Sequence, residues 1–307
     1  MNKYFIVMTL ILASAGALCS ESLVSSNIEG RPVQVVASFS VLADLANEVG
    51  GDLVEVYSLV GWDEDSHVFH PSPRAVRRLT SAELLLINGL GLEGWVERLI
   101  SAAGYSGHLL VASSGVSLIE INEEEHHHHH HDEKVLYDPH AWHSLIAAKQ
   151  YVVNIMQALQ EVDPENEQIY HDNAQHYLQR LDALDLSIKV RVNKLEGEKH
   201  IVMPHNAFEY LARDYGFKIH SLQGLSTESE ASAAQIVSVV RQIKRHNIKA
   251  IFTENVVNGR LIEIVTKETG VALGGALISG ALSREAAPTY IDMFKYNVDV
   301  MIKALSQ

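Results

Sequence analysis

The chain has 307 residues, of which 47% are hydrophobic and 20% charged, an ordinary balance for a globular protein of two domains. Its formal net charge is −14, which argues against a nucleic-acid partner. The one cysteine has no partner for a disulfide, so stability must come from the size of the core.

The first residues have the pattern of a secretory signal. Lys3 precedes an apolar stretch over residues 4–12, and small residues follow up to Ala17. We expect a cleaved signal peptide over 1–19 and a soluble periplasmic protein, because no segment is long and apolar enough to span a membrane. Leucine at position 18 fits a lipobox poorly, so we do not expect lipid anchoring at Cys19.

Residues 30–160 alternate between strand-like and helix-like segments. The strands are expected at 33–37, 53–60, 84–87 and 108–112, and the helices at 41–49, 73–78, 95–103 and 144–159. The run Leu84–Ile87 is continuously apolar, which is typical of a strand buried on both faces. Such alternation predicts a parallel sheet flanked by helices.

Residues 117–136 interrupt this lobe and have no periodicity. They hold six consecutive histidines between acidic residues: His126, His127, His128, His129, His130 and His131. We expect a mobile loop that binds metal weakly for scavenging or hand-off, although a merely solvated insert has the same composition. Protonation below a pH of about 6.5 should end its metal binding.

A long helix is predicted over residues 163–197. Asp163 is placed to cap its start, Pro164 to occupy the first turn and Gly197 to stop it. A helix of this length would be roughly 50 Å long, which exceeds the diameter of a small domain. We therefore expect a stiff connector between two lobes, with small motions on ligand binding.

Residues 198–307 repeat the α/β rhythm. Strands are expected at 200–203, 218–222, 249–252 and 271–278, and a final helix at 290–305. The predicted fold class is α/β, with two lobes that are each a mainly parallel sheet flanked by helices.

Three histidines outside the run lie in loops of similar kind. His67 and His205 each follow an expected strand, and His140 follows Asp138-Pro139, which favours a turn. Ligand sites in open α/β sheets lie beyond the carboxyl ends of strands, and imidazole is a common metal ligand. Position alone leaves open a shared metal site or three separate hydrogen-bonded histidines.

The segments around these histidines resemble the metal-binding solute-binding proteins of zinc and manganese ABC importers, known as cluster A-I. That family carries the motifs D-x-H-x-x-x-P-[ST]-P, [DN]-P-H-x-W and H-[DN]-A-F-x-Y-x-A-x-x-Y-G. Here they read Asp65–Pro73, Asp138–Trp142 and His205–Gly216, and the segments Ser226–Glu230 and Ile251–Glu254 also match. The resemblance covers essentially the whole mature chain and implies that His67, His140 and His205 are the metal ligands.

One position departs from the family pattern. Gly280 stands where members usually carry an aspartate ligand, and glycine has no side chain to bind with. Three imidazoles with an open fourth position suit Zn2+ better than Mn2+, which prefers carboxylate oxygens. Candidates for a fourth contact, or for side chains that support the ligands, are Glu64, Asp65, His70, His143 and Glu254.

The expected function is capture of Zn2+ for an ABC importer, with manganese as the alternative metal. The permease and its ATPase must be separate chains, because this one has neither a membrane span nor a Walker-A loop, and we expect a monomer. Two rivals remain: a zinc hydrolase with a glutamate as base, and a metal-buffering protein or adhesin that meets no transporter. No H-E-x-x-H helix supports the first, and we expect no enzyme.

Overall fold

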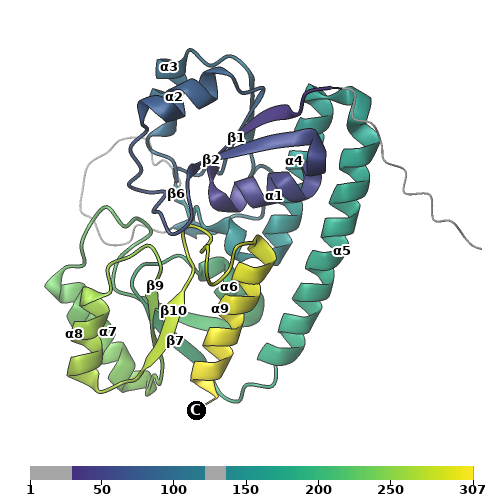
Figure 1. Cartoon of the computed structure of the whole chain (residues 1–307). Coiled ribbons are helices and arrows are strands. Elements are labelled where there is room, and N and C mark those ends of the chain that lie inside the picture. Colours follow the sequence, from purple (N-terminus) through teal and green to yellow (C-terminus); the bar gives the residue numbers. More distant parts are fainter. Residues whose placement is uncertain (1–29, 122–135, 307) are drawn as a thin grey trace, which may run out of the picture. The chain divides into compact units, whose positions relative to one another are not determined.

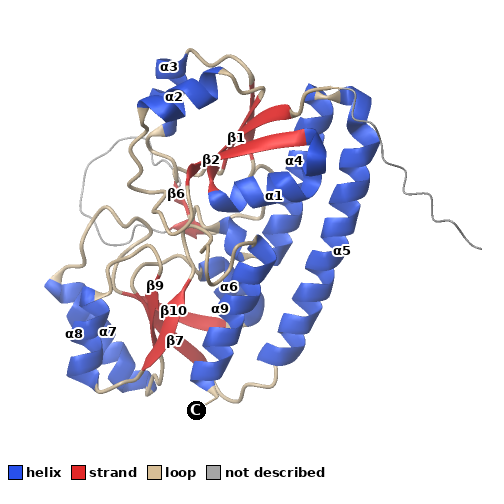
Figure 2. Ribbon diagram, in the orientation of Figure 1, coloured by secondary structure: helices blue, strands red, loops and turns tan. Residues whose placement is uncertain are grey.

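Two parallel sheets organise this protein, as the computed structural model shows (Figures 1 and 2). The structure describes residues 30–121 and 136–306, and the residues from Pro32 onward form one compact unit. Each sheet has four strands and is flanked by helices. The expected α/β architecture of two lobes with a long helix between them is confirmed.

The N-terminal lobe is built on the strand order β2-β1-β3-β4, with every pair parallel. The four residues of β3 are all buried, as the continuous apolar run predicts. The strands are β1 (Val33–Phe39), β2 (Val54–Val60), β3 (Leu84–Ile87) and β4 (His108–Val111). The helices are α1 (Ser40–Gly50), α2 (Pro73–Thr80) and α3 (Val96–Ala103), with a 3-10 turn at Gly51–Leu53.

A short antiparallel pair frames the histidine-rich segment. Strand β5 (Glu120–Ile121) pairs with β6 (Leu136–Tyr137), and Ile121 lies opposite Leu136. The expectation that all of residues 117–136 lack regular structure is therefore wrong at both ends, where apolar residues allow a ladder that is too short to leave a periodic pattern. The six histidines from His126 to His131 lie outside the described residues.

Helices α4 (Leu145–Val162) and α5 (Glu167–Val192) pack side by side, and a 3-10 turn at Ala141–His143 precedes them. Helix α5 also packs against α1 of the N-terminal lobe and α9 (Tyr290–Leu305) of the C-terminal lobe (Figure 1). Its 26 residues make a rod about 39 Å long. The buried stripe that holds it follows a 3–4 spacing: Tyr170, Ala174, Tyr177, Leu181, Leu184, Ile188 and Val192.

Both ends of this helix differ from the prediction. A 3-10 turn, Pro164–Asn166, precedes it, because the Asp163 carboxylate accepts hydrogen bonds from the Asn166 amide and the Tyr170 hydroxyl and caps no backbone N–H. At the other end, the N–H groups of Lys194 and Leu195 donate to carbonyls three residues earlier. The last turn thus tightens after Val192 instead of continuing to the expected stop.

The C-terminal lobe has the strand order β10-β9-β7-β8, again with every pair parallel. The strands are β7 (Lys199–Met203), β8 (Phe217–Ser221), β9 (Ile251–Glu254) and β10 (Leu273–Leu277). The further helices are α6 (Glu209–Tyr215), α7 (Ala233–His246) and α8 (Arg260–Thr269). A capping box of Ser232 and Gln235 starts α7, and Asn247 ends it in the left-handed conformation.

The lobes share one apolar core, which runs from the N-terminal sheet through α4 and α5 to β7 and α9. Several buried hydrogen bonds cross between the lobes, and two of them involve Trp142: its indole donates to the Ser279 carbonyl at 3.0 Å, and its carbonyl accepts from the Tyr290 hydroxyl at 2.7 Å. A smaller cluster lies between the C-terminal sheet and helices α7 and α8. These contacts make the lobe interface part of the folded core.

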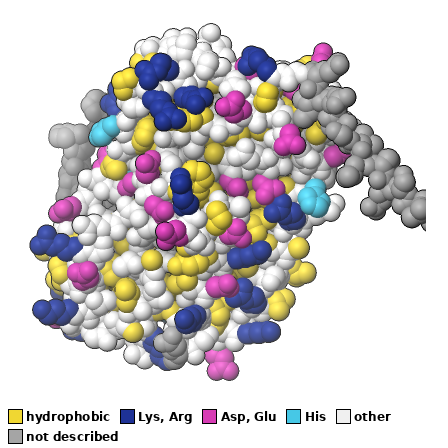
Figure 3. All heavy atoms as spheres, viewed as in Figure 1, with side chains coloured by type: hydrophobic (Ala, Val, Ile, Leu, Met, Phe, Trp, Pro, Cys, Tyr) yellow, Lys and Arg dark blue, Asp and Glu magenta, His cyan; other side chains and the backbone are white. Residues whose placement is uncertain are grey.

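At the surface, acidic and basic side chains are both spread over the face seen in Figure 3. Within residues 30–121 and 136–306, no helix has the length and apolar character that crossing a membrane requires.

Candidate metal centre

His67 lies in the loop between β2 and α2, and contacts from both lobes fix this loop. The Asp65 carboxylate accepts a hydrogen bond from the His67 backbone N–H at 2.9 Å and from the Thr227 hydroxyl at 2.6 Å. The indole of Trp95 donates to the Ser66 carbonyl at 2.9 Å. Since Thr227 belongs to the C-terminal lobe, Asp65 links the two lobes beside His67.

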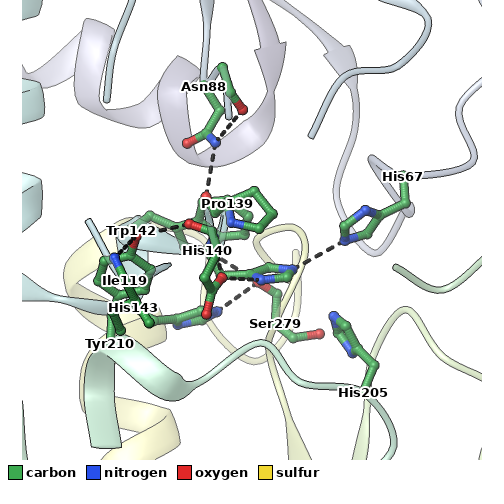
Figure 4. Close-up of polar contacts among 12 residues, drawn as sticks. His67, Asn88, Ile119, Pro139, His140, Trp142, His143, His205, Tyr210 and Ser279 are labelled. Atoms are coloured by element: carbon green, nitrogen blue, oxygen red, sulfur yellow. Dashed lines mark hydrogen bonds and ion pairs between the residues drawn. The ribbon is translucent and has the colours of Figure 1, made fainter. Parts of the chain in front are cut away.

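His140 is oriented by the aspartate two residues before it. Asp138 Oδ1 accepts from both the backbone N–H and the Nδ1–H of His140, each at 2.8 Å. The proline between them is held by Asn88, whose amide donates to its carbonyl at 2.9 Å (Figure 4). Because Nδ1 is occupied, the free Nε2 of His140 points toward His67.

His205 follows the end of β7 and is paired with Glu254 at the end of β9. One oxygen of Glu254 accepts from the His205 backbone N–H at 3.1 Å, and the other lies 2.5 Å from Nδ1. The histidine and the carboxylate that orients it thus lie at the same edge of the sheet, at the ends of two neighbouring parallel strands. Ligand sites in open α/β sheets are expected at this edge.

These three histidines converge between the lobes (Figure 4). The Nε2 atoms of His67 and His140 are 3.2 Å apart, and the ring centroids of the three histidines are 5.3 to 5.9 Å apart. Two nitrogens bound to one tetrahedral zinc lie about 3.3 Å apart. His205 Nε2 is buried and has no hydrogen-bond partner among the described residues. The three imidazoles therefore have the spacing that a metal ion requires, and His205 has a nitrogen that is available to bind it.

Burial controls the charge of these imidazoles. Desolvation, followed by the neighbouring His140, lowers the pKa of His67 to about 3, and desolvation lowers the pKa of His140 well below its ordinary value. Burial is the largest single effect on His205 and would lower its pKa, but Glu254, together with Asp65 and Asp138, outweighs burial and raises that pKa. At neutral pH His67 and His140 are thus neutral, which is the form that binds a metal.

The five candidates for a further contact are engaged elsewhere or face solvent. Asp65 and Glu254 hold the backbone N–H groups of His67 and His205, and Glu64 accepts from the Gly61 N–H at 2.8 Å. His70 is exposed. The Nε2 of His143 donates to the Ser279 carbonyl at 2.9 Å, and its ring packs on Phe208.

Gly280 is buried, and a side chain there would meet Val256 at 3.2 Å. Its neighbour Ser279 has a buried hydroxyl with no partner among the described residues.

Two orienting contacts were not among the predictions, although one of them has a local signal in the sequence. The Asp138–His140 pair was predictable from its spacing, because an aspartate two residues before a histidine can accept from its backbone N–H. The link between Thr227 and Asp65 joins residues 162 positions apart, and no local signal marks it.

The chain matches known proteins along almost its whole length. The family model described as zinc-uptake complex component A, periplasmic, matches residues 35–304. The manganese-binding lipoprotein MntA of Halalkalibacterium halodurans is 32% identical over 306 residues, covering 99% of this chain and 98% of the relative. The metal ABC transporter substrate-binding lipoprotein ScbA of Streptococcus cristatus is 29% identical over 317 residues, covering all of both.

The fold also matches solved structures. The manganese-bound periplasmic metal-binding protein of Candidatus Liberibacter asiaticus superposes with a TM-score of 0.79 at 29% identity, covering 90% of this chain and 100% of the other. The motifs, the fold and the sequence matches all agree. This chain belongs to the family of zinc-uptake complex component A, the extracytoplasmic metal-binding components of ABC importers, which act with a separate permease and ATPase and are not enzymes.

Proposed function

We propose that the protein captures Zn2+ with His67, His140 and His205 and delivers it, as a monomer in the periplasm, to the permease of its importer. The observation that carries this proposal is the convergence of three imidazoles, each with one ligand nitrogen within 4.8 Å of the others, and His205 Nε2 is buried without a hydrogen-bond partner among the described residues. Membership of this family argues against the alternative of a zinc hydrolase, because its members are not enzymes.

The donor set favours zinc over manganese. Imidazole nitrogen suits zinc, whereas manganese prefers carboxylate and water oxygens. The carboxylates beside the histidines, Asp65, Asp138 and Glu254, are engaged by neighbouring groups. Glycine at position 280 supplies no oxygen ligand, so we propose water in the fourth position.

Manganese remains the alternative metal, since a specific observation favours it. The relative from Halalkalibacterium halodurans is named manganese-binding, and the structure from Candidatus Liberibacter asiaticus holds manganese. If Glu254 turned one oxygen from His205 Nδ1 to the ion, the site would gain the carboxylate that manganese prefers.

We propose that the lobes move little on binding. Helix α5 packs on both lobes, and buried hydrogen bonds from Trp142 and Tyr290 cross between them. Small-angle scattering with and without zinc tests this: the radius of gyration should stay constant, and a clear contraction on adding zinc would contradict it.

The anchor at the N-terminus needs a direct test. We infer export through a cleaved signal over residues 1–19, which lie outside the described residues. Leu18 argues against lipidation of Cys19, but several relatives are named lipoproteins. Mass spectrometry of the exported protein decides: an unmodified N-terminus supports a free periplasmic protein, and a diacylglyceryl group on Cys19 overturns that expectation.

The metal site itself is tested by competitive titration of mature protein that lacks residues 123–134. We expect one tightly bound zinc, lost on His67→Ala or His140→Ala. The matched control is His70→Ala, in the same loop but exposed, which should leave the affinity unchanged. Loss of tight binding with the loop deletion alone would contradict the assignment.

Affinity in solution does not identify the metal used in the cell, because zinc binds most sites more tightly than manganese. A deletion strain should therefore be grown under zinc and manganese limitation in turn. We expect a growth defect that added zinc relieves and added manganese does not. The same defect should persist with the His140→Ala protein, and rescue by manganese alone would assign the site to manganese.

A further inference from the structure

A second group of histidines lies on the C-terminal lobe, away from the three-histidine site. His200 is the second residue of β7, whereas His205 lies beyond the other end of that strand. The four residues from His200 to Met203 alone span about 10 Å, or three rises of a strand. The second group therefore cannot share an ion with the first.

Parallel register and helix packing assemble this group. In the pairing of β7 with β8, His200 lies opposite Lys218, so His200 and His220 occupy the same face two positions apart. Helix α7 packs on both strands, and His246 is its last residue. Glu198 immediately precedes β7. Residues separated by 48 positions are thus brought to one sheet edge.

The side chains are in direct contact. His200 Nε2 lies 3.0 Å from Glu198 Oε2, and His200 Nδ1 lies 2.9 Å from His220 Nε2. The His246 ring stacks on His200 with centroids 4.4 Å apart, and on His220 at 5.8 Å. One ligand atom from each of Glu198, His200 and His246 lies within 4.8 Å of the others.

We propose that Glu198, His200 and His246 form an auxiliary site for a borderline divalent cation such as Zn2+, with His220 orienting His200. The 3.0 Å between His200 Nε2 and the Glu198 oxygen is close to the roughly 3.3 Å edge of a tetrahedral zinc site. The ion takes the place of the hydrogen on His200 Nε2, and the neutral ring then carries its one proton on Nδ1, so the change at His200 is one of tautomer.

The environment supports each role. His200 Nδ1–H donates to His220 Nε2 when Nε2 binds metal, which is the usual arrangement for a ligating histidine. His246 ends a 14-residue helix, where the partial negative charge of the last carbonyls favours a cation.

Other features limit the affinity. Glu198 and His246 are exposed, and the cation of Lys218 lies on the same face of the sheet. Lys244 and Arg245 in the last turn of α7 add further positive charge. The site should therefore bind zinc far more weakly than the buried three-histidine site and exchange it readily with solvent.

The test is equilibrium dialysis of the full mature chain in which His126–His131 are replaced by serine, at about 50 μM free zinc, which is below ordinary crystal-soaking concentrations. We expect His246→Ala and Glu198→Gln to bind one zinc fewer than the parent, and His220→Ala to weaken that zinc about 10- to 100-fold. All three variants are expected to fold, because His246 and Glu198 are exposed and His220 is only partly buried.

Two controls make the outcome specific. His171→Ala removes an exposed histidine whose Nδ1 lies 3.2 Å from Asp172, and it should retain both zinc ions. His140→Ala should lose only the tight zinc, which separates this proposal from the proposed function. Equal zinc content in the parent and His246→Ala would overturn the auxiliary site and leave the group as stacked, hydrogen-bonded histidines.

Discussion

Asp138 offers the sharpest test of how the site is built. Its carboxylate accepts two hydrogen bonds from His140, each at 2.8 Å, and both atoms of the His140–Asp138 contact are buried. Asn in its place keeps an acceptor oxygen in the same position and removes the negative charge. The substitution therefore removes the charge that stabilises a metal-bound imidazole but keeps the hydrogen bonds that orient it.

The magnitude follows from the difference between two kinds of hydrogen bond. A bond to a charged group contributes about 1.5–3 kcal/mol and a neutral one about 1 kcal/mol. We expect Asp138→Asn to lose about 1.4 kcal/mol of metal binding, which is a tenfold increase in Kd, with about 100-fold as the upper limit for a residue that supports a ligand. Asp138→Ala should lose more, since orientation is lost too.

The assay is competition against a chromophoric zinc chelator at pH 8. Burial raises the pKa of Asp138 to about 7, so at pH 8 the wild-type carboxylate is ionised before the metal binds. Circular dichroism checks that the variant is folded. An unchanged Kd in folded Asp138→Asn would refute the reasoning, because it would mean that the charge does not act on His140.

Three further changes test the lobe interface and the loop. Tyr290→Phe removes the buried hydrogen bond to the Trp142 carbonyl and should cost about 1–2 kcal/mol, seen as a lower Tm by calorimetry; an unchanged Tm would refute this. Thr227→Val removes the hydrogen bond to Asp65 and should raise the zinc Kd about fivefold, the equivalent of 1 kcal/mol. Identical titration curves would show that Asp65 supports His67 without the hydrogen bond from Thr227. Burial raises the pKa of Asp44 from 3.8 to about 7, so the folded chain keeps a proton there that the unfolded chain has released, and the group's contribution to stability falls as pH rises between those values. Asp44→Asn keeps an acceptor for the Tyr290 N–H, and its Tm relative to wild type should increase by several degrees from pH 4.5 to pH 8, whereas a constant difference would contradict the shifted pKa.

Much of the fold follows from local patterns. The continuous apolar run Leu84–Ile87 predicts a buried strand, and the 3–4 spacing of apolar residues in α5 predicts a helix. Pro73 marks the start of α2. The limits of α5 were missed because a side-chain hydrogen bond at its start and backbone hydrogen bonds at its end replace the regular helical pattern. Asp163 bonds Tyr170 instead of the backbone, and the last turn tightens before Gly197.

The metal site was likewise predicted only in part. The positions of His67, His140 and His205 after strands and turns were compatible with a shared site, since carboxyl ends of parallel strands share an edge, and the family resemblance implied that the three converge. What orients their rings depends on partners distant in sequence, such as Glu254 for His205. The group of Glu198, His200 and His246 was not predicted at all, because it arises from strand register and from the packing of α7.

The proposed metal centre requires one zinc ion bound to three imidazoles between the lobes. Crystals grown with one equivalent of zinc, measured by anomalous diffraction at the zinc absorption edge, locate the ion. We expect one strong peak, with the Nε2 atoms of His67, His140 and His205 each about 2.0–2.1 Å from it. A strong peak at other residues, with none between these three histidines, would contradict it.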